Sequence, residues 1–180
     1  DLIDLAGVPT TAASRVTGRV PATWDAPVVA RLRAAGAILI GKCNLHEFAF
    51  GTTGEDSSHG QTLHPRDPNR SPGGSSGGSA VSVATGMAFA TLGTDTGGSI
   101  RIPAAACGLV GLKPTFGEVS CDGVVPLAPS LDHVGPLTRC VRDARLVYRA
   151  IRDHQGGESA PTNGAAQKLG CPRPYFLDRL

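Results

Sequence analysis

The feature that most constrains this chain is a stretch of small residues between Ser71 and Pro114, which contains two serine sites flanked by glycines. The first site is Gly-Gly-Ser-Ser-Gly-Gly over residues 73–78, and the second is Thr-Asp-Thr-Gly-Gly-Ser over residues 94–99. Glycine pairs let a backbone turn tightly and approach other groups closely. We therefore expect both sites to be tight turns that lead into helices.

The composition is that of a globular protein that can bury a core of its own. The 180 residues are 41% hydrophobic and 18% charged, and a formal net charge of +2 gives no signal of a polyanionic partner. No apolar run reaches membrane-spanning length. Five cysteines without a Cys-x-x-Cys pair predict a reduced, cytoplasmic protein with buried or incidental thiols, and the scattered histidines predict no metal site.

Hydrophobic patterns predict helices and strands on both sides of this stretch. Asp25 is the expected N-cap of a helix that has Pro27 in its first turn and ends at Gly36. Further helices are expected over residues 79–87, 100–107 and 139–153, the last with Thr138 as its cap, and buried strands over residues 37–40 and 89–93. A helix followed by an all-apolar strand is typical of a sheet covered by helices, so the expected class is α/β.

Both ends of the sequence predict a piece of a longer protein. The chain has no initial Met, and residues 1–4 resemble the middle of a strand or loop. It stops at Leu180 without a clear terminal cap. We expect a core over residues 1–153, a linker rich in Gly, Ser, Pro and Asn over residues 154–167, and the start of a further segment over residues 168–180.

A serine that follows two glycines at a helix N-terminus has the parts of an acyl-transfer site. Free N–H groups at such a turn bind an anion, either a phosphate or the oxyanion of a tetrahedral intermediate. Ser99 follows Thr96-Gly97-Gly98 and has that geometry available. The second site is therefore the stronger candidate for a nucleophile.

A serine nucleophile also needs a group that takes its proton. A Ser-His-Asp arrangement is disfavoured, because Asp132 and His133 are adjacent and their side chains diverge. The remaining relay candidates for Ser99 are Ser75, Ser76 and a lysine whose pKa is lowered from about 10.4 by burial or neighbouring dipoles.

Taken together, these motifs resemble the amidase signature family. The resemblance is carried by residues 73–79, 93–103 and 108–114. It extends to residues 41–48, which are similar to the family's Gly-Lys-Thr-Asn-x-x-Glu-Phe segment with Cys43 in place of Thr, and to Ser-Leu-Asp-x-x-Gly-Pro over residues 130–136. The similarity covers residues 1 to about 153.

That family hydrolyses amides with a Ser-Ser-Lys triad, and the resemblance implies its fold, a mixed β-sheet core covered by helices on both faces, here incomplete. It implies that Ser99 is the nucleophile that forms an acyl-enzyme, and that Ser75 is the relay serine, held through a cis peptide bond. The hydroxyls of Ser75 and Ser99 are expected to be hydrogen-bonding neighbours. The implied supporting residues are Ser76, Asp95 and Arg101, and the implied oxyanion hole is lined by the N–H groups of Thr96, Gly97, Gly98 and Ser99.

The same resemblance places the catalytic lysine directly before Asp1, outside this sequence. Lys42 matches a different position of the family, Lys113 matches a structural segment, and Lys168 follows the predicted linker, so none of the three is the expected base. The chain by itself is therefore expected to be nearly inactive.

Several functions stay open at this point. The first expectation is a general amidase that converts carboxylic amides to acid and ammonia or amine without a metal or organic cofactor. Such an enzyme would bind a small-molecule amide substrate and would contact neither nucleic acid nor a membrane. A homodimer is compatible with this expectation. The alternative is the glutamine-hydrolysing A-type subunit of a tRNA-dependent amidotransferase, which works with partner subunits. Outside catalysis, the glycine loops are compatible with a phosphate or anion-binding module, although neither fits G-x-x-x-x-G-K-[ST], or with an inactive scaffold.

Overall fold

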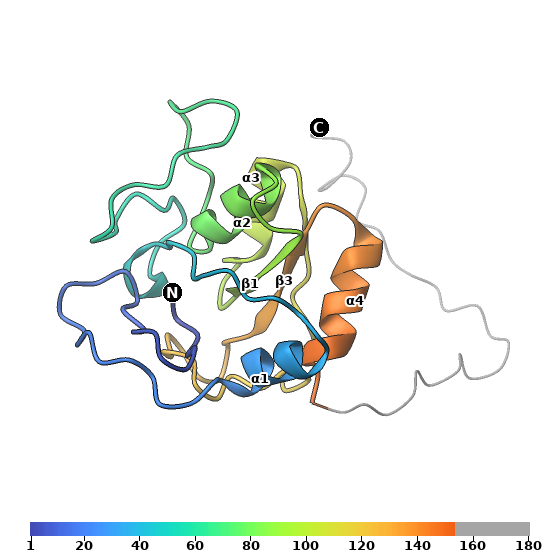
Figure 1. The fold of residues 1–180 in the computed structure, drawn as a ribbon. Coiled ribbons are helices and arrows are strands. Elements are labelled where there is room, and N and C mark those ends of the chain that lie inside the picture. The colour runs from blue at the N-terminus through green and yellow to red at the C-terminus, as the bar shows by residue number, and fades with distance from the viewer. Residues whose placement is uncertain (154–180) are drawn as a thin grey trace, which may run out of the picture.

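The computed structural model describes residues 1–153, and Figure 1 shows how their elements are arranged. In chain order the elements are α1 (Pro27–Ala34), the 3-10 helix η1 (Glu47–Ala49), α2 (Gly77–Ala84), β1 (Ala90–Thr94), α3 (Arg101–Cys107), β2 (Val110–Gly111), β3 (Val134–Thr138) and α4 (Val141–Ile151). The predicted linker and the segment after it lie outside the described residues.

Three strands form a small sheet in the order β1-β3-β2, and both neighbouring pairs are antiparallel. The register places Gly93 opposite Gly135 and Leu92 opposite Pro136. A proline is unusual in a middle strand because it cannot donate to the ladder, but the Pro136 carbonyl still accepts from the N–H of Leu112 at 3.0 Å. A Cβ at position 135 would lie 2.1 Å from the Leu112 carbonyl oxygen, so the strand can pass there only as glycine.

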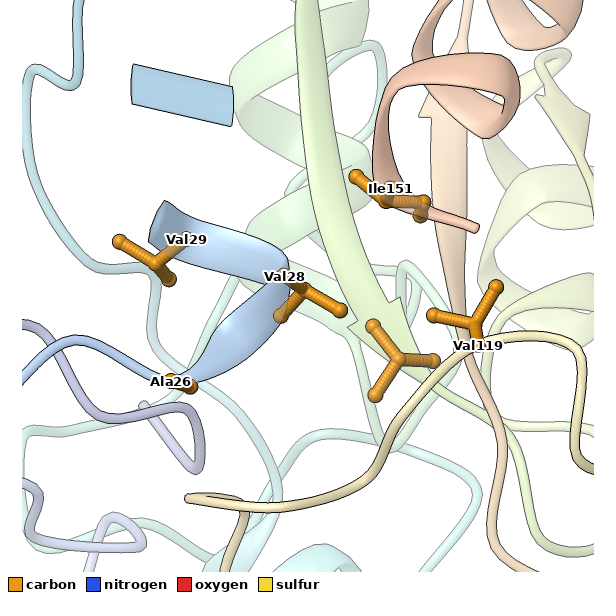
Figure 2. Close-up of a cluster of buried hydrophobic side chains, with 6 residues drawn as sticks. Ala26, Val28, Val29, Val119 and Ile151 are labelled. Atoms are coloured by element: carbon orange, nitrogen blue, oxygen red, sulfur yellow. The ribbon is translucent and has the colours of Figure 1, made fainter. Parts of the chain in front are cut away.

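Helices cover both faces of this sheet, which confirms the predicted α/β class. On one face Val134 of β3 belongs to a core cluster with Val28 of α1 and Ile151 of α4. On the other face Leu137 of β3 belongs to a cluster with Ala80 of α2. Side chains that are an odd number of positions apart on a strand point to opposite faces, which explains the division. Figure 2 shows the first cluster, with Ala26, Val28, Val29, Val119 and Ile151.

The predicted N-cap of helix α1 is wrong. The residue at the N-cap is Ala26, and it makes no side-chain capping bond. The Asp25 carboxylate instead accepts from the Ala6 N–H at 2.8 Å and from Arg33 Nε at 2.7 Å. The Ala6 N–H from a distant segment and the Arg33 side chain from the same helix have thus taken the acceptor that the helix start would have used. The end of the helix agrees with the prediction, because Gly36 follows it with φ of 82°.

Residues 37–40 form no strand, so the prediction of a buried strand there is wrong for the described structure. The side chains of Ile38 and Ile40 are 89% and 72% exposed, and only Leu39 packs against the core. An apolar run can reveal that a segment suits a sheet, but strand formation depends on a neighbour that supplies the hydrogen bonds.

Helix α2 begins two residues before its predicted start and ends three residues before its predicted end. The early start is possible because Gly78 has no side chain: a Cβ there would lie 2.3 Å from the Asn44 carbonyl oxygen. The early end coincides with Gly86, whose φ of 77° is left-handed. Helix α2 therefore lies directly on the backbone of the segment around Asn44.

Strand β1 and helices α3 and α4 lie close to their predicted places. The predicted cap of α4 is wrong, because the N-cap is Cys140 and the Thr138 hydroxyl donates to the Cys140 carbonyl at 2.9 Å. Val141, at the first position of the helix, is exposed, while Ala144 and Ile151 are buried. Helix α4 therefore packs on the core through positions after its start.

Within residues 1–153 the cysteines Cys43, Cys107, Cys121 and Cys140 are free thiols. The same residues contain no group of three His, Cys, Asp or Glu side chains that could hold a metal ion. None of the helices described is long and apolar enough to cross a membrane.

The role of β3 in both core layers can be tested with two leucines. Replacing the fully buried Leu137 with Ala should lower the free energy of unfolding by about 2–5 kcal/mol, because it removes transfer energy and leaves a cavity. Replacing the exposed Leu146 of α4 with Ala should change it by less than about 0.5 kcal/mol. Urea unfolding of both variants measures the difference, and equal effects would contradict this account of the core.

Candidate active site

The first serine loop is held from several sides. The peptide bond between Gly74 and Ser75 is cis, as the family resemblance led us to expect. Ser75 is completely buried, and its carbonyl accepts from the His46 N–H at 3.0 Å. Its hydroxyl has no hydrogen-bond partner among residues 1–153. The loop therefore fixes the Ser75 backbone and leaves a buried hydroxyl available.

The two serine sites lie against each other, and Ser76 makes the junction. The Ser76 N–H donates to the Ser99 carbonyl at 3.2 Å. The Ser76 hydroxyl lies 3.3 Å from both the carbonyl oxygen and the N–H nitrogen of Thr94, at the end of β1. One residue of the first loop thus contacts both ends of the second.

The predicted hydrogen bond between the hydroxyls of Ser75 and Ser99 is not present, because the Ser75 hydroxyl has no partner in the part of the chain described. The loops meet through peptide groups instead, since the Ser99 carbonyl is occupied by the Ser76 N–H. The prediction that the two sites come together is correct, and the predicted atoms of contact are wrong.

The second loop presents a row of free backbone donors. The N–H groups of Thr96, Gly97, Gly98 and Ser99 have no acceptor among residues 1–153. Gly98 and Ser99 are buried, and buried N–H groups are nearly always hydrogen-bonded. Gly98 has φ of 135°, a conformation that favours glycine. Four consecutive donors without an acceptor in the described residues, beside a serine, supply the type of group that an oxyanion site needs.

Asp95 closes this loop on the start of α3. Its carboxylate is fully buried and accepts from the N–H groups of Ile100 and Arg101 at 3.2 and 3.4 Å. The Arg101 guanidinium adds two more bonds, from Nε at 3.0 Å and Nη2 at 2.9 Å. Burial alone would raise the pKa of Asp95, but the bonds from Arg101 and Ile100 hold that pKa below its ordinary value. The carboxylate therefore stays ionised, and braces the loop.

Asp132 and His133 support the same loop from outside. The side chains diverge, as predicted: Asp132 accepts from the Thr96 hydroxyl at 2.5 Å, whereas His133 Nδ1 lies 3.1 Å from the Asp95 carbonyl oxygen. Lys113 contacts the other ring nitrogen of His133 at 3.1 Å. These residues hold Thr96 and Asp95 in place, a function that adjacency in the sequence did not reveal.

The sequence model of the protein family described as Amidase matches residues 1–169, which is far more than half of the chain. The chain belongs to the amidase signature family.

Relatives of this family member include the A-type subunit of glutamyl-tRNA(Gln) amidotransferase from Anaeromyxobacter sp. strain K. It is 57% identical, and the match covers 100% of this chain and 39% of the relative. The corresponding protein of Roseiflexus sp. strain RS-1 is 48% identical, with 98% of this chain and 39% of the relative covered. The chain thus spans about two fifths of the length of these relatives.

Solved structures of the family have the same fold. The A-type subunit of glutamyl-tRNA(Gln) amidotransferase from Thermotoga maritima has 49% identity and a TM-score of 0.82 over 84% of this chain and 34% of that one. The peptide amidase of Stenotrophomonas maltophilia has 42% identity and a TM-score of 0.80 over 90% of this chain and 35% of that one. A peptide amidase and an amidotransferase subunit therefore share the fold of this chain.

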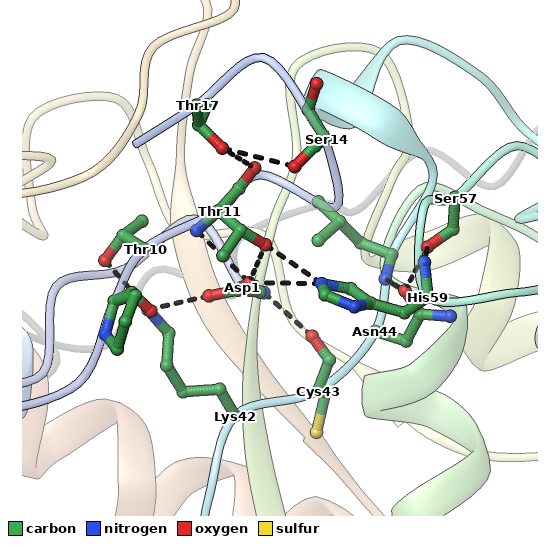
Figure 3. Close-up of polar contacts among 12 residues, drawn as sticks. Asp1, Thr10, Thr11, Ser14, Thr17, Lys42, Cys43, Asn44, Ser57 and His59 are labelled. Atoms are coloured by element: carbon green, nitrogen blue, oxygen red, sulfur yellow. Dashed lines mark hydrogen bonds and ion pairs between the residues drawn. The ribbon is translucent and has the colours of Figure 1, made fainter. Parts of the chain in front are cut away.

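In this amidase signature chain Lys42 serves to hold the N-terminal segment. Its ammonium contacts Asp1 Oδ1 at 2.7 Å, Thr10 Oγ1 at 2.8 Å and the Pro9 carbonyl at 3.0 Å (Figure 3). Burial lowers the pKa of Lys42 to about 8, partly opposed by the charge of Asp4. Because all three contacts lie in residues 1–10, the geometry agrees with a structural role for this lysine.

His46 had no role predicted from the sequence, and the structure places it beside the first serine loop. Its side chain is buried, and its backbone N–H holds the Ser75 carbonyl. The residue stands in the segment that resembles the family's Gly-Lys-Thr-Asn-x-x-Glu-Phe motif, but at one of the unspecified positions. No local pattern could have singled it out.

Replacing Asp95 with Asn should lower the free energy of unfolding at neutral pH by about 1–3 kcal/mol, because the charge that Arg101 and two N–H groups bind is lost. The folded pKa of Asp95 lies below the unfolded value of about 3.9, so its contribution is present above that value and is lost as the pH falls through the folded pKa. The difference between the two proteins should therefore shrink below about pH 4.

Urea unfolding across this pH range measures the effect. The control is Asp122→Asn at an exposed carboxylate, which should be close to neutral throughout. A destabilisation by Asp95→Asn that stays constant down to low pH would show that the charge is not the source.

Proposed function

We propose that this chain carries the two serines of an amide-hydrolysing site and is part of the glutamine-hydrolysing A-type subunit of a tRNA-dependent amidotransferase. The observation that carries the proposal is the junction of the two serine loops, where the N–H groups of residues 96–99 have no acceptor within residues 1–153. The other loop carries the buried Ser75 hydroxyl, which has no partner among the same residues.

In the proposed reaction, Ser99 Oγ attacks the amide carbon, and its proton passes through Ser75 to a lysine. The N–H groups of residues 96–99 bind the oxyanion of the tetrahedral state, where unpaired donors stabilise charge most. The proton then reaches the departing nitrogen, and ammonia leaves an ester on Ser99. Water hydrolyses that ester by the same relay in reverse. Asp95 and Arg101 keep the loop in shape.

The lysine is proposed to be the residue directly before Asp1. The Asp1 nitrogen lies 2.8 Å from the Cys43 carbonyl oxygen, and the same segment continues to Asn44, whose carbonyl binds the Gly78 N–H, and to His46, whose N–H binds Ser75. Asp1 is thereby held close to the segment that contacts the relay serine. Lys42 and Lys113 are not proposed as bases, because both have structural partners.

The amidotransferase is preferred to a general amidase because of the curated relatives, which reach 57% identity across the whole chain. In that case partner subunits are required, and the substrate-selecting segments lie in the longer protein. A free amidase is the second candidate, since the peptide amidase structure is also similar at 42% identity. A cytoplasmic location stays a prediction from the cysteine usage.

A phosphate-binding module is less favoured than either enzyme. In the first glycine loop the N–H groups of Ser76 and Gly78 are taken by the carbonyls of Ser99 and Asn44. Donors that already hold the protein together cannot bind a phosphate. The second loop keeps four consecutive donors, at residues 96–99, that have no acceptor within residues 1–153, and these donors stand beside a serine side chain.

The nucleophile can be tested in a polypeptide of the relatives' full length. A fluorophosphonate probe should label the wild type, and Ser99→Ala should lose both labelling and ammonia release, with kcat lower by about 10⁴-fold or more. Ser130→Ala, at an exposed serine, is the control and should keep both. Undiminished hydrolysis by Ser99→Ala would rule out the proposed chemistry.

The substrate can be tested with the same protein. Ammonia release from glutamine should exceed release from simple primary amides and peptide amides, and should rise when the other subunits of the amidotransferase are added. A preference for peptide amides without any effect of partner subunits would favour the free amidase instead.

A further inference from the structure

We infer that His46 is a positioning residue for the relay serine: its imidazole holds residues 52–54 against Gly74 and so sets the backbone that carries Ser75. The inference rests on the proposed function, because it assigns a reason for the placement of the serine that moves the proton. It concerns a side chain that does not itself touch the substrate or the reacting atoms.

The first step is the bond between the imidazole and the 52–54 segment. His46 Nδ1 accepts from the Gly54 N–H at 3.2 Å, and both residues are buried. Since Nδ1 accepts, the ring proton is on Nε2, which faces the Asp56 carboxylate at 3.4 Å. The Asp56 side chain is largely exposed, so the bond to Gly54 is the stronger constraint.

The second step is the contact between that segment and the peptide before Ser75. A Cβ at Gly74 would lie 2.9 Å from the Gly54 nitrogen and 3.0 Å from backbone atoms of Thr52 and Thr53. The Ser71 hydroxyl donates to the Thr53 carbonyl at 2.5 Å, which joins the same two stretches. Residues 52–54 therefore form a wall against the Gly74 peptide, and a movement of one requires a movement of the other.

The third step is the position of the ring itself. A Cβ at Gly51 would lie 2.1 Å from Cε1, 2.2 Å from Nε2 and 2.5 Å from Cδ2 of His46. The ring lies against a backbone that has no side chain, and has no room to shift towards it. Meanwhile the His46 N–H binds the Ser75 carbonyl. His46 thus holds the relay serine in two ways. Its backbone N–H binds the Ser75 carbonyl, and its imidazole binds Gly54, which lies against the peptide before Ser75.

The consequence is specific to the proton transfer. Loss of the ring acceptor leaves the buried Gly54 N–H unpaired and frees the wall behind Gly74. A displaced Ser75 transfers the proton poorly but binds no substrate, so kcat should fall while KM stays nearly constant. If the substitution only destabilised the protein, fewer molecules would be folded, but the molecules that remain folded would keep the normal kcat.

The experiment compares His46→Ala, His46→Gln and His46→Asn in the full-length protein, with glutamine as substrate. Asn places an oxygen near the position of Nδ1, whereas Gln places it farther out. We expect kcat to fall by about 10–100-fold in the Ala and Gln variants with KM within about twofold, and Asn to recover most of the loss. Active-site titration with the fluorophosphonate probe normalises each rate to the folded fraction.

A second variant disturbs the ring without changing the histidine. Gly51→Ala should push the imidazole off Gly54 and lower kcat as His46→Gln does, since Gly51 has no left-handed backbone that would add strain of its own. Its matched control is Gly18→Ala, where the nearest atom to a Cβ, Val20 Cγ2, lies 4.0 Å away. His64→Ala, at a histidine that contacts the Ala106 carbonyl of α3, controls for the loss of an imidazole.

The outcomes separate the inference from the function on which it rests. If Ser99→Ala keeps its activity, the proposed function fails. If Ser99→Ala is inactive but the Ala, Gln and Asn variants of His46 all keep kcat, the inference alone is overturned. Equal losses for Asn and Gln also overturn it, because the position of the acceptor would not matter. Should His46→Ala fail to fold, Gly51→Ala against Gly18→Ala decides the question.

Discussion

The structure depends on the contact in which Ser76 joins the two glycine-flanked serine loops. Its N–H binds the Ser99 carbonyl, and its hydroxyl lies between two backbone atoms of Thr94, so one residue connects a helix start with the end of a strand. Helix α2 and strand β1 must pack closely for this contact to exist. The Ser79 hydroxyl, bonded to the Leu92 carbonyl at 2.9 Å, keeps them so.

Close packing of this kind places strict demands on the backbone around the site. Gly93 faces the Ser76 hydroxyl at 2.8 Å from where a Cβ would be, and Gly135 faces the Leu112 carbonyl. A side chain at either position would force the strands or the loop apart. Hydrogen-bond acceptors are also placed selectively. The Asp95 carboxylate binds the N–H groups of Ile100 and Arg101 at the start of α3, whereas the N–H groups of residues 96–99 have no acceptor within residues 1–153. Rigidity and unpaired donors thus occur side by side.

Much of this arrangement could be predicted, because the motifs are local. The two loops, the cis bond before Ser75 and the bracing by Asp95 and Arg101 all follow from short runs of residues and their resemblance to a family. Some of the errors concern groups whose partners are distant in sequence. Asp25 was expected to cap its own helix, but its carboxylate binds the Ala6 N–H and the Arg33 side chain, and the apolar run at residues 37–40 has no ladder in the described structure.

The sequence by itself determined where the chain can turn and which helices bury a face, and its motifs indicated the serine loop whose N–H groups at residues 96–99 have no acceptor within residues 1–153. These properties depend on side-chain size and on neighbours a few positions away. Only the tertiary structure decided that the loops meet through Ser76 and Ser99 peptide groups, and that His46 lies against the wall that supports Ser75. Such contacts join residues that are far apart along the chain, and their geometry is set by how the helices and strands pack.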